Sequence, residues 1–364
     1  MIYVPLLKTR QEELNVALDM NNYFSDEIIP LFEIINEQYE TRYKINPITK
    51  AFLLEKRGKR NAKIKETPTD ADIITLDNIN ELVEDKKAFI DYFRFTIEKY
   101  GKNFDFSKVE LAWKLSGDSD LYKKKLLEVS KYENLIPTIS IKSGFEMKKN
   151  ELKSLLKELQ SRNDIVALRI TDEFLDLYSE LIINDLRHTD YFLFDIGEQN
   201  PNSKIMEFDE VKDINIKART ILLNSPRKAN IKNGDYEEFG ITELIDNSAR
   251  ELFREYEFDG FGDYCGLKDA LPTTGGSNGT GAALSLIYDY EKNGFYSFLN
   301  PDTSRGMRGY YKIIPVILSK KNILDPLDIC PAIEKVEDLK GPGNWCTWHN
   351  ITATRYIFQI YHNI

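Results

Sequence analysis

Short apolar runs alternate with longer amphipathic segments through the first two thirds of the chain. The short runs contain few polar residues, which is typical of parallel strands buried on both faces. In the longer segments apolar residues recur every three or four positions and favour helices, most clearly in residues 145–162. Strands that alternate with helices predict right-handed crossovers and a parallel sheet. The predicted strands are residues 2–7, 28–35, 109–115, 135–141, 165–170, 191–196 and 219–223.

Residues 36–100 contain two candidates for one further strand, residues 71–76 and residues 88–95. The apolar residues of the second candidate follow the spacing of a helical face better than strict alternation, so the first candidate is preferred. That choice leaves eight strands before residue 224, and eight parallel strands close a TIM barrel. The sequence therefore predicts an α/β protein with a TIM-barrel-like (β/α)8 domain over residues 1–256.

The composition changes after residue 256, where glycine, proline and aromatic residues become frequent. The strands predicted in this part are residues 282–290, 294–299, 310–318 and 356–361, the first two joined as a β-hairpin by residues 291–293. The chain leaves the last barrel helix toward the carboxyl ends of the strands. We therefore expect residues 257–364 to form a β-rich, antiparallel extension that packs on the barrel mouth.

The 364 residues carry a formal net charge of −10, with a pI of about 5.1. Such acidity argues against a surface built to neutralise phosphates, so non-specific nucleic-acid binding is disfavoured. The most basic stretch, residues 56–65, is interpreted as a solvated loop. The N-terminus lacks the features of a signal peptide, and no apolar run is long enough to cross a membrane. A cytoplasmic protein without membrane contact is therefore expected.

Single ionisable residues lie inside otherwise apolar strand runs. They are Glu33, Lys114, Arg169 and Asp195, and Lys8, Asp77 and Lys142 extend the same ring. An unpaired buried charge costs several kcal/mol, so these side chains must either pair with one another or face a wet cavity at the strand ends. In a cavity the carboxylates could act as acid, base or metal ligands, and a lysine could bind an anion or form a Schiff base. The alternative is a buried ion network that only fixes the strand register.

Two other segments deserve a functional interpretation, but neither carries a recognised motif. The glycine-rich residues 275–281 lack the ending of a phosphate-binding P-loop and are interpreted as a lid or a plain loop. His349 has aromatic neighbours and a nearby cysteine, so it could line a small polar pocket or serve as a core histidine. The three cysteines lie far apart and the histidines form no metal-binding pair, so no disulfide, zinc or other metal site is predicted.

The chain resembles the beta protein family, a bacterial and phage group. The similar segments are residues 3–8 with 11–14, residues 29–34, residues 261–264 with Pro272, and residues 343–349. This resemblance adds Asp263, Tyr264 and His349 to Lys8 and Lys142 as expected ligand-binding residues. The chain departs from the family pattern by an insertion at residues 36–70 and by a single His349 where relatives have two adjacent histidines. That departure weakens the case for His349 as a catalytic residue.

The family has no settled activity, but its members resemble components of phage-defence loci, often encoded beside a small nuclease-like protein. The resemblance implies an anti-phage defence component with a polar ligand or partner site at the strand ends. Its expected partner is a protein, either a co-encoded nuclease-like protein or a phage protein. The alternatives are a stand-alone barrel enzyme, either a metal-assisted phosphoester hydrolase or a Schiff-base lyase, and a non-catalytic scaffold. The sequence identifies no cofactor and does not decide whether the protein is an enzyme.

Overall fold

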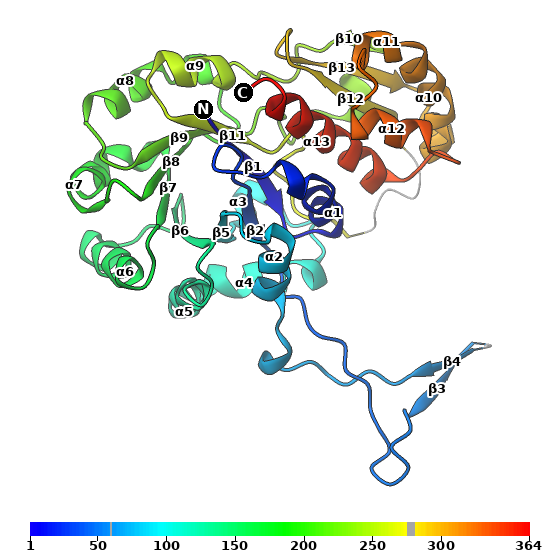
Figure 1. The fold of residues 1–364 in the computed structure, drawn as a ribbon, viewed down its shortest axis with the longest axis horizontal. Helices are drawn as coiled ribbons and strands as arrows, with labels where there is room; N and C mark the ends of the chain where they lie inside the picture. The colour runs from blue at the N-terminus through cyan, green and yellow to red at the C-terminus, as the bar shows by residue number, and fades with distance from the viewer. Residues whose placement is uncertain (59, 275–280) are drawn as a thin grey trace.

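The computed structural model describes residues 1–58, 60–274 and 281–364. Eight parallel strands close into a barrel in the order β1-β11-β9-β8-β7-β6-β5-β2 (Figure 1). The barrel strands are β1 Ile2–Lys8, β2 Leu31–Ile34, β5 Ala88–Tyr92, β6 Leu135–Ile141, β7 Ala167–Thr171, β8 Tyr191–Asp195, β9 Arg219–Leu223 and β11 Gly260–Asp263. The predicted TIM-barrel-like α/β fold is therefore confirmed.

Helices surround the barrel strands (Figure 1). They are α1 Gln11–Met20, α2 Thr75–Val83, α4 Glu110–Gly117, α5 Ser119–Val129, α6 Lys149–Arg162, α7 Leu175–Asp185, α8 Ile205–Asp213 and α9 Ala249–Glu255. Helix α6 buries Leu152, Leu155, Leu156 and Leu159, as its three- and four-residue spacing predicts. Asp118 caps α5 because its side chain accepts hydrogen bonds from the backbone amides of Asp120 and Leu121.

The predicted number of strands is right, but two of the eight members differ. Residues 88–95, interpreted as a helix, contain strand β5, whereas residues 71–76, interpreted as a strand, form a 3-10 turn and the start of α2. Residues 109–115, also predicted as a strand, fall in α4. The eighth strand is β11, which lies after residue 256, the expected end of the barrel. Every residue of β5 is buried, so it shows no alternation, and periodicity cannot separate such a strand from a buried helix.

The C-terminal part combines a small sheet with helices. Strands β10 Phe239–Ile241, β12 Ala283–Asp289 and β13 Gly294–Asn300 form an antiparallel sheet in the order β10-β13-β12. The predicted hairpin is confirmed, and Asn293 takes a positive φ of 45° in its turn. The remaining helices with more than four residues are α10 Tyr310–Ser319, α12 Pro331–Glu337 and α13 Trp345–Tyr361.

Two strands predicted in this part are wrong, because residues 310–318 belong to α10 and residues 356–361 to α13. In α10 the buried Tyr310, Ile313 and Ile317 recur with helical spacing. Most residues of α13 from Trp348 onward are buried, so its last turns resemble a buried strand in sequence. Helix α13 lies beside α1 at the barrel (Figure 1). No helix among the described residues is long and apolar enough to cross a lipid bilayer.

Between β2 and α2 the chain leaves the barrel and returns. Strands β3 Leu54–Arg57 and β4 Arg60–Lys63 pair in antiparallel fashion near the outer end of this excursion. Figure 1 shows the excursion projecting away from the barrel, and we call residues 39–73 the arm. Its base is closed by a bridge between Tyr39 and Ile73.

Candidate active site at the barrel mouth

Charged side chains from several barrel strands meet at the carboxyl ends of those strands. The Arg169 guanidinium lies at the centre of the group. Its Nη1 donates to Glu33 Oε1 at 2.7 Å and to Asp91 Oδ2 at 2.9 Å. Its Nη2 donates to Asp195 Oδ2 at 2.7 Å. Four strands, β2, β5, β7 and β8, thus place charges of opposite sign in direct contact.

A second cation extends this group toward the loop after β11. Lys8 Nζ lies 2.5 Å from Glu33 Oε2 and 2.6 Å from Asp269 Oδ1. Asp269 Oδ2 accepts a hydrogen bond from the Tyr100 hydroxyl at 2.7 Å, and Tyr264 donates to Glu33 Oε1 at 2.8 Å. We call this group the mouth network; its members are Lys8, Glu33, Asp91, Arg169, Asp195, Tyr264 and Asp269.

The mouth network is buried, and the opposite charges around Glu33 and Arg169 keep these two groups ionised. None of the side chains that form its ion pairs is more than 10 % exposed. Burial would raise the pKa of Glu33, but the charges of Lys8 and Arg169 outweigh it and lower that pKa to about 2. Burial likewise opposes the charge of Arg169, yet Asp195 and Glu33 raise its pKa well above the usual value. This is the directly paired arrangement named above as the alternative to an open, solvated site.

The sequence predicted one ring for Glu33, Arg169, Asp195 and Lys8, and the structure brings these four together. Tyr264, expected as a ligand-binding residue from the family resemblance, also joins them. Two carboxylates were missed. Asp91 is the single charge of the buried run that forms β5, and it was missed because that run was interpreted as a helix. Asp269 lies in the loop after β11, where no periodic pattern points to it. A search for single charges in any apolar run would have found Asp91.

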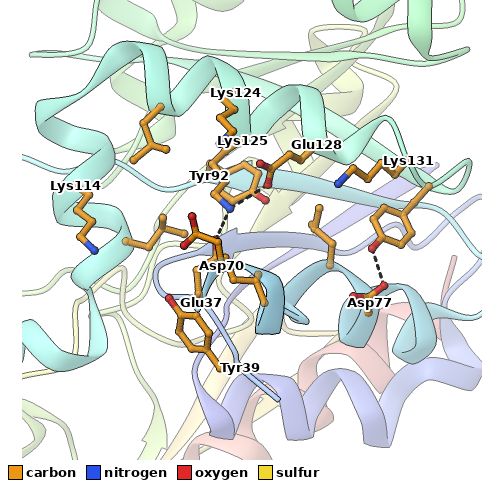
Figure 2. A pocket seen from close by; sticks show the side chains of 15 residues that line it. Glu37, Tyr39, Asp70, Asp77, Tyr92, Lys114, Lys124, Lys125, Glu128 and Lys131 are labelled. Carbon is orange, nitrogen blue, oxygen red and sulfur yellow. Dashed lines mark hydrogen bonds and ion pairs between the residues drawn. The ribbon is translucent and has the colours of Figure 1, made fainter. Parts of the chain in front are cut away.

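Lys114 does not belong to the barrel mouth, which corrects its predicted role. It lies on α4, its side chain is exposed, and it pairs with Glu110 at 2.8 Å. It lines a cavity of about 290 Å³ between α2, α4 and α5 on the outside of the barrel (Figure 2). Asp77 lies in the same cavity, where its carboxylate accepts a hydrogen bond from Tyr132 (Figure 2). Both predictions failed because the underlying segments are helices and not strands.

Lys142 follows β6 directly and differs from the other cations of the mouth. Within the described residues its amine makes no ion pair and no hydrogen bond, and it lies 4.2 Å from the centre of the Phe93 ring. Burial lowers the pKa of Lys142 to about 7. Asp91 opposes this change, while the positive charge of Arg169 adds to it. Such an amine is partly neutral at neutral pH and can act as a nucleophile or base.

Asp263, at the end of β11, holds the C-terminal part against the barrel. Its carboxylate accepts hydrogen bonds from Tyr356 of α13 at 2.7 Å, from Tyr3 of β1 at 3.0 Å, and from the backbone amide of Cys265 at 2.8 Å. Burial raises the pKa of Asp263 to about 6 in spite of these three donors. These contacts join β1, β11 and α13, so the geometry gives Asp263 a structural role.

His349 lies on α13 among three cations. Its Nδ1 atom is buried and has no hydrogen-bond partner among the described residues. Burial lowers the pKa of His349 to about 3, and the positive charges of Arg227, Arg10 and Lys268 act in the same direction. The imidazole is therefore neutral near pH 7 and surrounded by positive charge.

This environment predicts a dependence of stability on pH. The unfolded chain protonates His349 below about pH 6.5, whereas the folded chain does not until about pH 3, so stability is lost as the pH falls below 6.5. Between pH 7 and pH 5 the free energy of unfolding should fall by about 1–2 kcal/mol less in His349→Gln than in the wild type. Urea unfolding at both pH values measures the difference. His188→Gln, which changes an exposed histidine, should retain the wild-type profile; equal profiles for all three proteins would contradict the assignment.

Most of the glycine-rich segment, residues 275–280, lies outside the described residues, so its interpretation as a lid or loop stays a prediction. In the part of the chain that is described, no three or more His, Cys, Asp or Glu side chains are grouped to hold a metal ion. The family profile described as Beta protein matches residues 3–360, which is nearly the whole chain. No curated protein and no solved structure matches the chain.

Proposed function

Because the chain belongs to the Beta protein family, we propose that it is a component of a bacterial anti-phage defence system whose barrel mouth binds a small ligand at Lys142. The defence setting rests on the family resemblance, and the ligand site rests on the geometry at the strand ends. A co-encoded nuclease-like protein or a phage protein is the proposed partner.

The unpaired amine of Lys142 is the observation that carries the ligand site. Two of the cations at the strand ends, Lys8 and Arg169, each contact two or more carboxylates. Lys142 directly follows β6, which lies between β5 and β7, the strands that carry Asp91 and Arg169. A ligand with a carboxylate, phosphate or carbonyl group would supply the contact that the described residues do not provide.

The same geometry favours a Schiff-base enzyme as the second candidate. A neutral lysine amine adds to a carbonyl carbon to form the C–N bond, and the carbonyl oxygen leaves as water after taking up one proton from the amine and one from solvent. The resulting iminium carries the positive charge that the lysine would otherwise hold. Asp91 and Glu33 both raise the pKa of Lys142, so the same charges would stabilise this iminium.

The remaining alternatives have weaker support. A metal-assisted phosphoester hydrolase needs free carboxylates, but Glu33, Asp91 and Asp195 all bind Arg169. A non-catalytic scaffold agrees with the paired mouth network but leaves the unpaired Lys142 without a role.

Reductive trapping tests the amine. The protein is incubated at pH 7 with glyoxylate and cyanoborohydride, and the modified lysines are identified by peptide mass spectrometry. We expect the earliest adduct on Lys142, because exposed lysines with ordinary pKa values are almost fully protonated at this pH. Lys142→Met should abolish this adduct, and Lys149→Met, an exposed neighbour on α6, should retain it. Labelling spread evenly over exposed lysines would contradict a reactive Lys142.

A phage plaque assay tests the setting separately. Cells that express the wild-type locus or the Lys149→Met variant should be protected, and Lys142→Met should lose protection while its melting temperature stays unchanged. Selective trapping without any protection by the wild-type locus would reject the defence setting and retain the amine site. Full protection by Lys142→Met would reject a role for this amine in defence and favour the scaffold.

A further inference from the structure

The arm has the shape of a short β-ribbon held away from the body of the protein. Strands β3 and β4 pair from Leu54 with Lys63 to Arg57 with Arg60. Residues 42–46 run beside this ribbon, because Lys44 hydrogen-bonds to Ile64 and Leu53 through the backbone. Figure 1 shows the ribbon in the outer part of the arm, away from the barrel. The chain from residue 58 to residue 73 could span at most about 50 Å.

Positive charge is concentrated on this ribbon. Residues 42–65 contain nine lysines and arginines and one acidic residue, Glu55. Six of these cations are exposed and make no ion pair with any described residue: Lys44, Lys50, Lys56, Arg60, Lys63 and Lys65. Arg42, at the base, pairs with Asp72 at 2.6 Å. The unpaired charges therefore belong to the outer part of the arm. Because the net charge of the whole chain is −10, the residues outside the arm must together be more negative than −10.

Apolar side chains lie among these cations without a core to cover them. Ile48 is 89 % exposed and Leu54 is 56 % exposed. Phe52 is also exposed, and Lys63 Nζ lies 3.7 Å from the centre of its ring. A solvated loop would not need exposed isoleucine, leucine and phenylalanine beside six unpaired cations. Exposed cations beside exposed apolar side chains indicate a surface that contacts a polyanion, and this polyanion must itself present apolar groups.

We propose that the arm binds double-stranded DNA through the surface formed by β3, β4 and residues 44–53. The major groove of B-form DNA admits a two-stranded β-ribbon, and its thymine methyl groups offer apolar contacts. The lysines and arginines neutralise phosphates on both sides of the groove. An acidic protein also carries negative charge, but it offers no regular groove for a ribbon. The DNA assignment is independent of Lys142.

The acidity of the whole chain does not oppose this assignment. Charges are screened over about 10 Å at 0.1 M salt, and the arm projects away from the barrel (Figure 1). Phosphates at the ribbon therefore respond to the local positive charge more than to the acidic barrel. The net charge disfavoured nucleic acid, and residues 56–65 were interpreted as a solvated loop. The structure places these basic residues on an arm that projects away from the barrel (Figure 1).

Fluorescence anisotropy with a labelled 24-base-pair DNA duplex tests the proposal on the full chain. Six phosphate contacts predict that raising the salt from 50 to 200 mM weakens binding about 10³-fold. In the fourfold variant Lys44→Gln, Lys56→Gln, Arg60→Gln and Lys63→Gln, the same change in salt should weaken binding only about tenfold, because about two contacts remain. At 50 mM salt that variant should bind at least about 10²-fold more weakly than the wild type.

A matched control changes four exposed lysines outside the arm to glutamine: Lys102, Lys149, Lys217 and Lys228. It should bind DNA as the wild type does, and both variants should melt at the wild-type temperature because the changed side chains are exposed. Equal losses in the two variants, or wild-type binding by the arm variant, would overturn the proposal. Tighter binding of an RNA duplex would reject groove recognition of DNA, and equally tight binding of polyglutamate would indicate an acidic protein partner instead.

Discussion

Glu33→Gln is expected to destabilise the fold by about 3–5 kcal/mol, because it leaves two buried cations without one of their carboxylates. Lys8 would retain only Asp269, and Arg169 would retain Asp91 and Asp195. Glutamine keeps the shape of the side chain but carries no charge, so the cost is electrostatic. Denaturant unfolding at pH 7 measures it. Because the pKa of Glu33 is lowered to about 2, its stabilising charge is present above about pH 4.5 and is lost as the pH falls toward 2.

The control for this change is Glu110→Gln on α4, which removes the exposed partner of Lys114. Exposed pairs contribute little, so its effect should stay within about 0.5 kcal/mol. A loss below about 1.5 kcal/mol for Glu33→Gln would mean that water reaches the mouth network and compensates Lys8 and Arg169. The open-site interpretation of the strand-end charges would then be preferred to the paired network.

Gly260→Ala is expected to destabilise the protein by about 3 kcal/mol or more, because β1 and β11 approach too closely for an added side chain. An added Cβ at Gly260 would lie 2.0 Å from the backbone oxygen of Ile2, which cannot move without breaking the pairing of β1 with β11. At Gly262 the corresponding distance to the oxygen of Val4 is 2.5 Å. Denaturant unfolding with far-ultraviolet circular dichroism measures the loss.

Gly117→Ala is the matched control, because an added Cβ at this last residue of α4 meets no atom of the described residues within 4 Å. It should be neutral or slightly stabilising, since alanine favours helices more than glycine does. If Gly260→Ala yields no folded protein, Gly262→Ala provides a second measurement on the same strand pair. Wild-type stability for both β11 variants would show that the closure of the barrel between β1 and β11 is looser than this geometry requires.

Local patterns were sufficient for the segments whose burial is uniform or strictly periodic. Strands β1, β6, β7, β8 and β9 appear in the sequence as apolar runs, because strands buried on both faces need little polar surface. Helix α6 and the β12–β13 hairpin follow from leucine spacing and from the turn residues. These elements are determined by residues that lie close together in the chain, so a sequence window of about 20 residues is enough to predict them.

The charged residues were recognisable for a different reason. A charge inside an apolar strand is expensive to bury, so Glu33, Arg169 and Asp195 had to be either paired or solvated. The sequence limits each charge to these two outcomes but does not name its partner. Asp91 pairs with Arg169 from a strand 78 residues away in the chain, and no local pattern records that distance.

Only the tertiary structure decided which segments complete the barrel and where the isolated charges lie. Strand β5 and the last turns of α13 are both fully or nearly fully buried, so the same apolar composition becomes strand in one and helix in the other according to its neighbours. Strand β11 contains two glycines, and its close contacts with β1 and, at Gly262, with Leu223 of β9 explain them. Lys114 and Lys142 both follow apolar residues, yet one lies on the outside of the barrel and one at its mouth. The residue sequence determined that buried charges need partners, and the long-range packing of strands selected those partners, because pairing energy depends on distance in space and not along the chain.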